Sequence, residues 1–309
     1  MRPFRFGLQC RGPLHDGGWP ALARKVEDLG YAVLTVADHL DDAPAPVPAL
    51  MAAADATTSL HVGTMVLAND YRHPVVVAKE AATIDVLSQG RFELGLGAGW
   101  STEDYGTAGF SLDRPGVRIA RLAEAIEVVR ALWRPEPVTF EGRHYRLSGL
   151  EGRPVPHRPG GPPIVTGGGG ERILRLAARA ADVVAINVNL EAGVIDQRAF
   201  PDGVSAATDR KIGWLRDEAG DRFDALELQV RIHLAMVTDD RAGTLSELAP
   251  AFGLTPDDAA ATPHALIGTV AEICDQLVER RERWGISYIG LSGDQIDAFA
   301  PVVARLAGT

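Results

Sequence analysis

The chain alternates short apolar runs with longer amphipathic segments. Eight apolar runs of strand length lie at residues 4–10, 32–37, 60–68, 92–96, 163–166, 183–188, 226–237 and 287–291. Helical periodicity fills most of the gaps, at residues 19–29, 75–87, 117–133, 172–181, 206–219, 270–284 and 296–306, with a shorter piece at 50–57. Eight successive strand–helix units are typical of a (β/α)8 barrel, so the sequence predicts an α/β fold of the TIM-barrel type rather than a doubly wound sheet.

Three segments interrupt the repeat. Residues 134–164 predict a small hairpin followed by a Pro/Gly-rich excursion, and residues 189–204 and 250–265 predict loop-like insertions. In a barrel these insertions would lie at the C-terminal face of the strands, where they would shape a pocket mouth. Because no linker divides the chain, we expect one barrel domain over residues 1–309.

Composition narrows the classes of function. The apolar fraction of 46% is sufficient for a large core, and the net charge of −10, without a Lys/Arg block, argues against a nucleic-acid or anionic membrane surface. Cys10 and Cys274 show no metal-binding spacing, so no metal site is expected and the reducing cytoplasm is the simplest compartment. The N-terminal residues do not resemble a secretory signal, and no apolar run has the length of a membrane span.

Four consecutive glycines, Gly167 to Gly170, separate an apolar run from a helical pattern in "PIVTGGGGERILRLAARA". The N-terminus of a helix attracts anions, and glycines let an anion approach the backbone closely. The stretch lacks both the Gly-Lys-Ser/Thr of a P-loop and a regular Gly-x-Gly-x-x-Gly. From these residues alone, a phosphate cradle and a simple tight turn both remain open.

Polar residues collect where the predicted strands end, which is the face of a barrel that carries active sites. Asp38 and His39 follow the second strand and are candidates for acid/base chemistry, although a polar pair also simply ends a strand. The fourth strand runs into "GLGAGW" at 95–100 and then into Glu103. A run of small residues suits a planar ligand close to the backbone, and equally suits tight packing at the barrel rim.

Five motifs occur in order along the chain: "VLTVADHL", "HVGTMVLANDYRHP", "GRFELGLGAGW", "FEGRHY" and "PPIVTGGGG". Together they resemble the luciferase-like monooxygenase superfamily, and within it the deazaflavin-dependent oxidoreductase branch. The resemblance extends from Phe4 to about Leu306.

The resemblance implies a barrel that holds coenzyme F420, or a flavin such as FMN, with the ring at the strand ends and the phosphate on the glycine run. It implies that His39 lies beside the reactive ring carbon, that Asp38 orients His39 or the substrate, and that the chemistry is hydride transfer. A non-prolyl cis peptide behind the ring would fall at Met65-Val66. The cofactor-binding residues implied are Met65, Val66, Ala98, Gly99, Glu103, Thr166, Gly167, Gly168, Gly169 and Gly170.

One departure from the family concerns the substrate. Deazaflavin-linked sugar-phosphate dehydrogenases of the family carry a glutamate directly after the Gly-x-Gly that ends the fourth strand, whereas this chain has Trp100. A Trp cannot donate that proton, which argues against a sugar phosphate as the substrate. Glu103 is then the candidate to replace the missing glutamate as proton donor. Trp19, Trp100 and Phe110 suit an apolar or aromatic substrate, and core packing explains each of them equally well.

Three functions follow in order of preference. The first is an F420-dependent oxidoreductase acting on an unidentified small organic molecule; the second is an FMN-dependent monooxygenase that uses O2; the third is a non-catalytic flavin- or deazaflavin-binding protein. F420 carries a polyanionic glutamate tail, so an acidic protein needs local cations, for which Arg72, Lys79, Arg172 and Arg175 are candidates. The family likeness also implies a homodimer, with no nucleic-acid or membrane partner.

Overall fold

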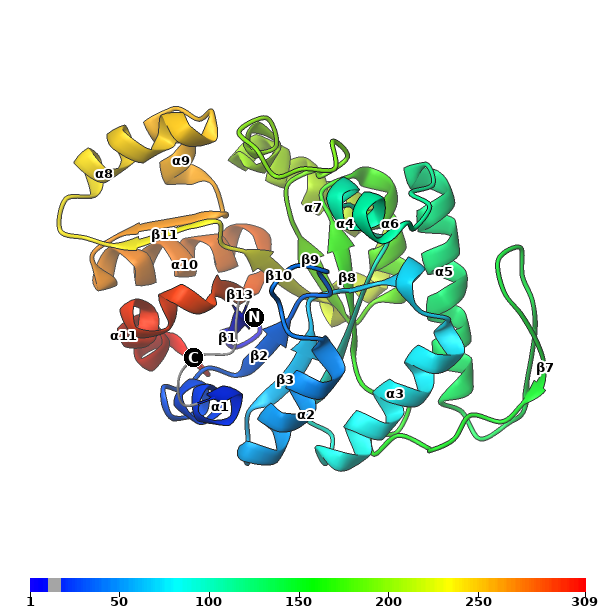
Figure 1. The fold of residues 1–309 in the computed structure, drawn as a ribbon. Coiled ribbons are helices and arrows are strands. Elements are labelled where there is room, and N and C mark those ends of the chain that lie inside the picture. Colours follow the sequence, from blue (N-terminus) through cyan, green and yellow to red (C-terminus); the bar gives the residue numbers. More distant parts are fainter. Residues whose placement is uncertain (11–17) are drawn as a thin grey trace.

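The computed structural model describes residues 1–10 and 18–309, and within them eight parallel strands close into a barrel (Figure 1). β1 pairs with β13 on one side and β2 on the other, and the pairing of β3 with β5 completes the ring. The predicted (β/α)8 barrel is therefore confirmed. The strands in order around the ring are β1 (Arg5–Cys10), β2 (Val33–Val36), β3 (His61–Thr64), β5 (Phe92–Gly97), β8 (Ile164–Gly168), β9 (Val183–Ile186), β10 (Glu227–Arg231) and β13 (Ile286–Ser292).

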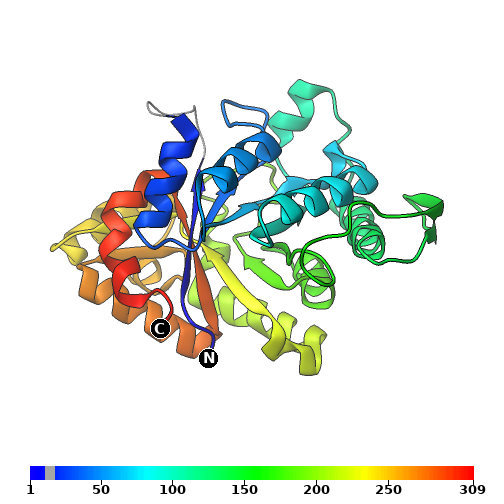
Figure 2. The same ribbon diagram turned by 90° about the horizontal axis from the view of Figure 1, so that it is seen from below.

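Helices form the outer layer around the strands (Figure 2). Each predicted helical segment is present, and prolines at the first helical positions begin α3 and α5, where a missing backbone N–H costs nothing. None of the helices in the described ranges is long and apolar enough to span a membrane. The helices that follow the barrel strands are α1 (Gly18–Asp28), α2 (Pro46–Ala56), α3 (Pro74–Leu87), α5 (Pro115–Leu132), α6 (Glu171–Ala180), α7 (Ser205–Ala219), α10 (Val270–Trp284) and α11 (Ile296–Leu306).

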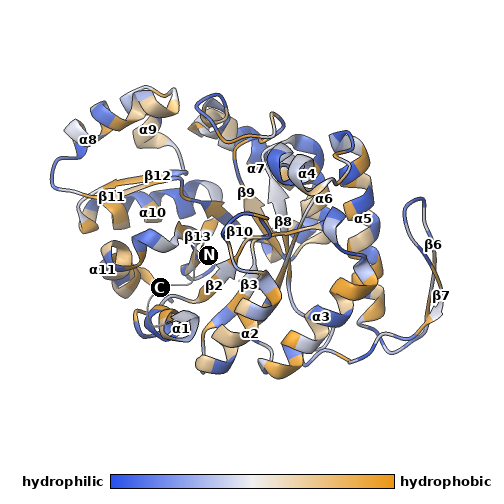
Figure 3. Ribbon diagram, in the orientation of Figure 1, coloured by the Kyte–Doolittle hydropathy of each residue, from blue (hydrophilic) through white to orange (hydrophobic). Residues whose placement is uncertain are grey.

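The core lies between the strands and the helices, because parallel barrel strands are covered on both faces and therefore consist of nearly continuous apolar residues. All six residues of β5 are buried, and Figure 3 shows the apolar colouring of the strands against the mixed colouring of the outer helices. The N-terminal end of the barrel is polar instead. There Arg5 bonds to Glu93 at 2.6 Å and to Glu227 at 2.8 Å.

Two additions depart from the simple repeat. β6 (Val138–Glu141) and β7 (Arg146–Leu150) form an antiparallel hairpin that projects beyond α5, which confirms the predicted hairpin (Figure 1). The second addition follows β10. The apolar run 226–237 is split, and its second half, β11 (Leu234–Val237), leaves the barrel to pair with β12 (Ala265–Gly268).

The prediction of a loop over 250–265 is therefore wrong. The segment between β11 and β12 contains α8 (Arg241–Leu248), the 3-10 turn η4 (Ala249–Phe252) and α9 (Pro256–Ala261). These pieces fold because their apolar side chains form a separate core of Leu245, Ala249, Ala259 and Ile267. By contrast, residues 189–204 are irregular up to the short turn η2 (Phe200–Gly203), as predicted.

The remaining short elements lie at strand ends. They are β4 (Leu67–Ala68), α4 (Thr102–Ala108), η1 (Asn69–Tyr71), η3 (Gly220–Ala225) and η5 (Gly293–Gln295). Of these, β4 and α4 position residues of the candidate site.

Candidate active site

A cavity of about 820 Å³ opens where the carboxyl ends of the barrel strands meet. In parallel α/β barrels this end carries the active site, because the loops that follow the strands converge there. The cavity brings together the residues proposed from the second, third, fourth and fifth strands. Among its lining residues are Asp38, His39, Met65, Val66, Ala98, Gly99 and the four glycines Gly167 to Gly170.

The glycine run forms one wall of the cavity. β8 ends at Gly168, and α6 begins after Gly170, which provides no side-chain cap. The N–H groups of the first turn, from Glu171 onward, have no carbonyl partner within the helix and belong to residues that line the cavity. A Cβ atom built at Gly169 would lie 2.3 Å from the backbone nitrogen of Asn189. The wall therefore has both free N–H donors and a backbone that only glycine allows to pack so closely, as an anion cradle requires.

A backbone bulge after β3 forms a second wall. The peptide bond between Met65 and Val66 is cis, as predicted, and Gln9 fixes the bulge by donating a hydrogen bond of 2.6 Å from Nε2 to the Met65 carbonyl. The glycines of β5 make room for it. A Cβ atom at Gly95 would lie 1.9 Å from the carbonyl oxygen of Thr64, and one at Gly97 would lie 2.5 Å from a Val66 methyl. The small residues of "LGLG" are therefore required by rim packing, while Gly97 also lines the cavity.

His39 is held by a carboxylate that the sequence did not single out. Its Nδ1 lies 2.7 Å from Oδ2 of Asp104, and its ring meets the Trp100 ring edge-on at a centroid distance of 5.5 Å. Asp104 is presented by α4, which Ser101 caps by accepting from the Asp104 N–H. Because an ionised carboxylate only accepts hydrogen bonds, Nδ1 carries the proton and Nε2 is the basic nitrogen.

The partner of His39 is Asp104 and not Asp38, so of the two roles expected for Asp38 only that of orienting the substrate remains, as a prediction. Oδ2 of Asp38 accepts hydrogen bonds from Arg72 and from the backbone N–H of Ala68, the latter at 3.1 Å. Asp38 is buried, so its charge requires these partners. Its role visible in the structure is to join the end of β2 to the segment after the bulge.

Two further predicted residues lie away from the cavity. Glu103 is exposed to solvent, because successive residues of a helix point about 100° apart and the neighbouring Asp104 takes the inward direction. Thr166 is fully buried behind the glycine run and is not a lining residue. The structure therefore supports neither as a contact of a ligand in the cavity, and the acid of α4 that lines the cavity is Asp104.

His233 is a lining residue that the sequence pattern does not single out as a site residue. It follows β10, and its Nε2 lies 2.8 Å from Oδ1 of Asn187 at the end of β9. Burial, together with the nearby positive charge of Arg231, lowers the pKa of His233 to about 4. The ring is therefore neutral at pH 7 and acts as a hydrogen-bonding group. The position directly after an apolar strand was the one available signal for it.

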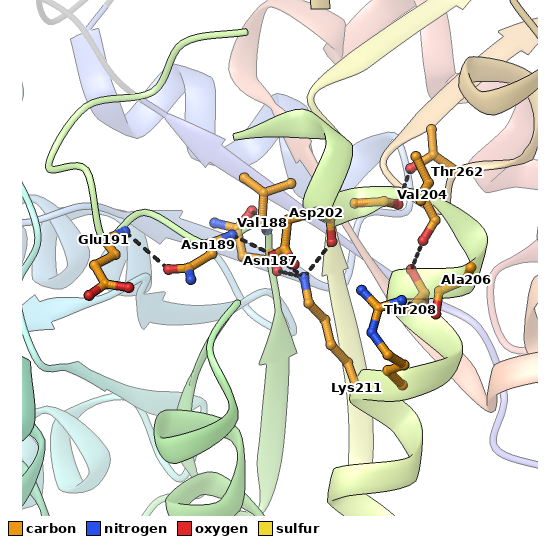
Figure 4. Close-up of polar contacts among 12 residues, drawn as sticks. Asn187, Val188, Asn189, Glu191, Asp202, Val204, Ala206, Thr208, Lys211 and Thr262 are labelled. Carbon is orange, nitrogen blue, oxygen red and sulfur yellow. Dashed lines mark hydrogen bonds and ion pairs between the residues drawn. The ribbon is translucent and has the colours of Figure 1, made fainter. Parts of the chain in front are cut away.

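Lys211 anchors the wall that faces the glycine run (Figure 4). Its side chain is 1% exposed, and Nζ donates to the Asn187 carbonyl at 2.8 Å, to the Asp202 carbonyl at 2.7 Å and to the Asp202 carboxylate at 2.6 Å. The same carboxylate accepts the Asn189 N–H at 2.8 Å. One lysine of α7 thus fixes the loop after β9 against the glycine wall. Burial lowers the pKa of Lys211, and its bond to Asp202 acts in the opposite direction.

Comparison with known proteins identifies the family to which the chain belongs. The model of the luciferase-like monooxygenase family matches residues 18–216, and the chain belongs to this family. It is 31% identical over 301 residues to an F420-dependent glucose-6-phosphate dehydrogenase of Nakamurella multipartita, an alignment that covers 92% of this chain and 84% of the relative. A protein of the same description from Mycobacterium avium is 36% identical over 171 residues, and this alignment covers 52% of the chain and 50% of the relative.

Solved structures agree with this fold. The F420-dependent tetrahydromethanopterin reductase of Methanopyrus kandleri superposes with a TM-score of 0.77 at 16% identity, over 98% of this chain and 99% of that one. A long-chain alkane monooxygenase superposes with a TM-score of 0.76 at 15% identity, over 99% of this chain and 91% of the other. The barrel is thus shared by F420-dependent enzymes and by monooxygenases, and the likeness of fold does not choose between them.

Proposed function

We propose that the protein is an F420-dependent oxidoreductase that transfers a hydride between the deazaflavin and a small organic substrate. The observation that carries the proposal is that one cavity contains both an anion cradle, Gly167 to Gly170, and an oriented histidine, His39. The F420-dependent dehydrogenases among the relatives favour F420 over FMN. The assigned cofactor contacts are Met65, Val66, Ala98, Gly99 and the four glycines.

The residues present fit such a cofactor. The free N–H groups at the start of α6 suit its phosphate, and the bulge at Met65-Val66 provides a firm surface behind a ring. When bound, F420 supplies or accepts the hydride. Arg118 donates hydrogen bonds to the carbonyl groups of Ala98 and Gly99 and so fixes the rim between the cradle and His39.

His39 supplies the proton chemistry in this proposal. Asp104 holds Nδ1, which leaves Nε2 as the nitrogen that takes a proton from a substrate hydroxyl, or returns one to a carbonyl in the reverse direction. The Asp104 carboxylate also stabilises the imidazolium that forms. Trp100 packs against the imidazole and stands where a second acid would lie in a sugar-phosphate dehydrogenase, so we propose a substrate more apolar than a sugar phosphate.

The decisive experiment is a pair of fluorescence titrations of the purified protein, one with F420 and one with FMN. We expect F420 to bind at low micromolar concentration or better and FMN about tenfold more weakly, a difference of about 1.4 kcal/mol. Tight FMN binding, together with oxygen consumption when reduced flavin is added, would assign the protein to the monooxygenases instead. Tight binding of F420 without turnover on any alcohol or carbonyl substrate would favour a carrier.

We also propose that residues 1–309 function as one barrel domain, in the cytoplasm and as a homodimer. The free thiols of Cys10 and Cys274 suit a reducing compartment, and the family resemblance supports the dimer. Light scattering on the eluate of a sizing column measures the mass; a monomer at working concentration would refute the dimer.

A further inference from the structure

A second pocket, of about 320 Å³, lies beside the first on the outer side of the barrel. It is formed by the start of α5, by the turn of the β6–β7 hairpin and by Arg172 of α6. Arg172 lines both cavities, and Pro115 of the first is followed directly by Gly116 of the second. The second pocket therefore adjoins the cavity on the side of the glycine cradle, with Arg172 between them.

Three arginines surround this pocket: Arg114, Arg143 and Arg172. All three are exposed, and none has an ion-pair partner within residues 1–10 and 18–309. Arg172 is also one of the cations proposed from sequence. Two others of that set differ from it, because Arg175 is paired with Glu171 and Glu218, and Arg72 with Asp38. In a chain with a net charge of −10, a pocket bordered by three unpaired arginines is an unusual concentration of positive charge.

Two further features of the pocket favour the binding of an anion. Nε2 of His144 is buried and lacks a hydrogen-bond partner in the described part of the chain. Gly116 lies in the first turn of α5, where the helix dipole is positive, and its own backbone N–H has no carbonyl partner within the helix. The nearby carboxylate of Glu124 is already occupied, since it accepts the backbone N–H groups of Arg143, His144 and Tyr145. The pocket thus offers donors at several points, and within the described ranges no ion pair joins Glu124 to any of the three arginines.

We infer that this second pocket binds the carboxylates of an oligoglutamate tail that continues from the cofactor phosphate on the glycine cradle. The inference rests on the proposed function, because F420 carries such a tail and FMN does not. The tail would pass Arg172 and lie between Arg114 at the helix start and Arg143 on the hairpin turn. The hairpin, which the barrel itself does not require, would then serve to recognise the cofactor.

The test compares two forms of the deazaflavin that both keep the phosphate, one with several glutamates and one with none. Affinities are measured by fluorescence titration at low and at high salt. The variant is Arg114→Gln/Arg143→Gln, which changes the second pocket and leaves Arg172 and the cradle intact. The matched control is Arg146→Gln, on the same hairpin but outside the pocket, where the side chain is 80% exposed.

We expect the wild type and the control to bind the glutamylated form about tenfold more tightly at low salt, and this preference to shrink as salt screens the charges. The double variant should lose most of the preference while binding the tailless form as the wild type does. Equal affinity of the wild type for the two forms, or an unchanged preference in the double variant, would overturn the inference. Failure of both forms to bind would instead refute the proposed function.

Discussion

Replacement of Gly169 by alanine is the sharpest test of the glycine cradle. The added Cβ atom would lie 2.3 Å from the backbone of Asn189 and of Val188, about 1 Å inside the 3.4 Å at which ordinary contact begins. That loop cannot retreat freely, because Lys211 and Asp202 hold it through hydrogen bonds to Asn187 and Asn189. Overpacking of this kind costs about 1–3 kcal/mol.

The same structure provides a matched control in the next residue. A Cβ atom at Gly170 would meet only the side-chain amide of Asn189, at 4.0 Å, and the backbone there has φ −87°, which any residue adopts. We therefore expect Gly170→Ala to bind the cofactor almost as the wild type does. Gly169→Ala should bind it about 5- to 150-fold more weakly, if the cost falls on the cradle.

Two measurements separate the possible outcomes. Fluorescence titration gives the affinity for F420, and urea unfolding without cofactor gives the stability of each variant. If the clash persists in the free protein, the Gly169→Ala variant loses stability. If the cradle deforms to relieve the clash, the variant loses affinity for F420. A Gly169→Ala protein that matches Gly170→Ala in both measurements would show that the contact between the two walls is not as close as described.

Three other predictions concern the site and His264, a buried histidine whose ring centroid lies 5.7 Å from that of His233. His39→Ala should slow turnover by about a hundredfold or more while changing F420 affinity only several-fold, and Asp104→Asn should reproduce part of the loss. Steady-state kinetics measures the turnover and titration measures the affinity. Normal turnover of His39→Ala would exclude His39 from the mechanism. Burial holds the pKa of His233 at about 4 and that of His264 at about 3, so the unfolded chain binds more protons than the folded one below pH 6.5. Stability should therefore fall as pH drops from about 6.5 to 4, and urea unfolding of His264→Asn should show a shallower fall; an identical slope would remove that histidine as the cause. Lys211→Met should weaken cofactor binding by about tenfold or more, since it leaves the Asp202 carboxylate without its cation; unchanged affinity in a folded variant would show that Lys211 is not needed to hold the wall.

The barrel was predictable because each of its strands is buried on both faces, so that the apolar runs are continuous and distinct. The same continuity of apolar residues made the end of β10 impossible to locate from the sequence. Residues 226–237 form one apolar run, and only the structure shows that the chain leaves the barrel near His233 to make β11. The partner strand, Ala265–Gly268, has only four residues and is too short to stand out by periodicity.

Site residues were predictable where position along a strand decides them, as for His39 and the glycine run. Site residues were not predictable where the direction of a side chain decides which residue reaches the site. Glu103 and Asp104 are adjacent acids, and only the orientation of α4 turns the second toward His39. Contacts through space, such as that between Lys211 and Asp202, join segments whose spacing carries no pattern.

The burial of Lys211 determines which amines of the protein are open to chemical labelling. The sequence contains three lysines, and the other two, Lys25 and Lys79, are exposed on α1 and α3 and line neither pocket. Amine-reactive dyes and resins will therefore attach at those two positions and at the N-terminus, and coupling through them leaves the mouth of the barrel open. The rate at which a fourth dye molecule attaches then reports how often the loop after β9 detaches, because only a detached loop exposes the amine of Lys211.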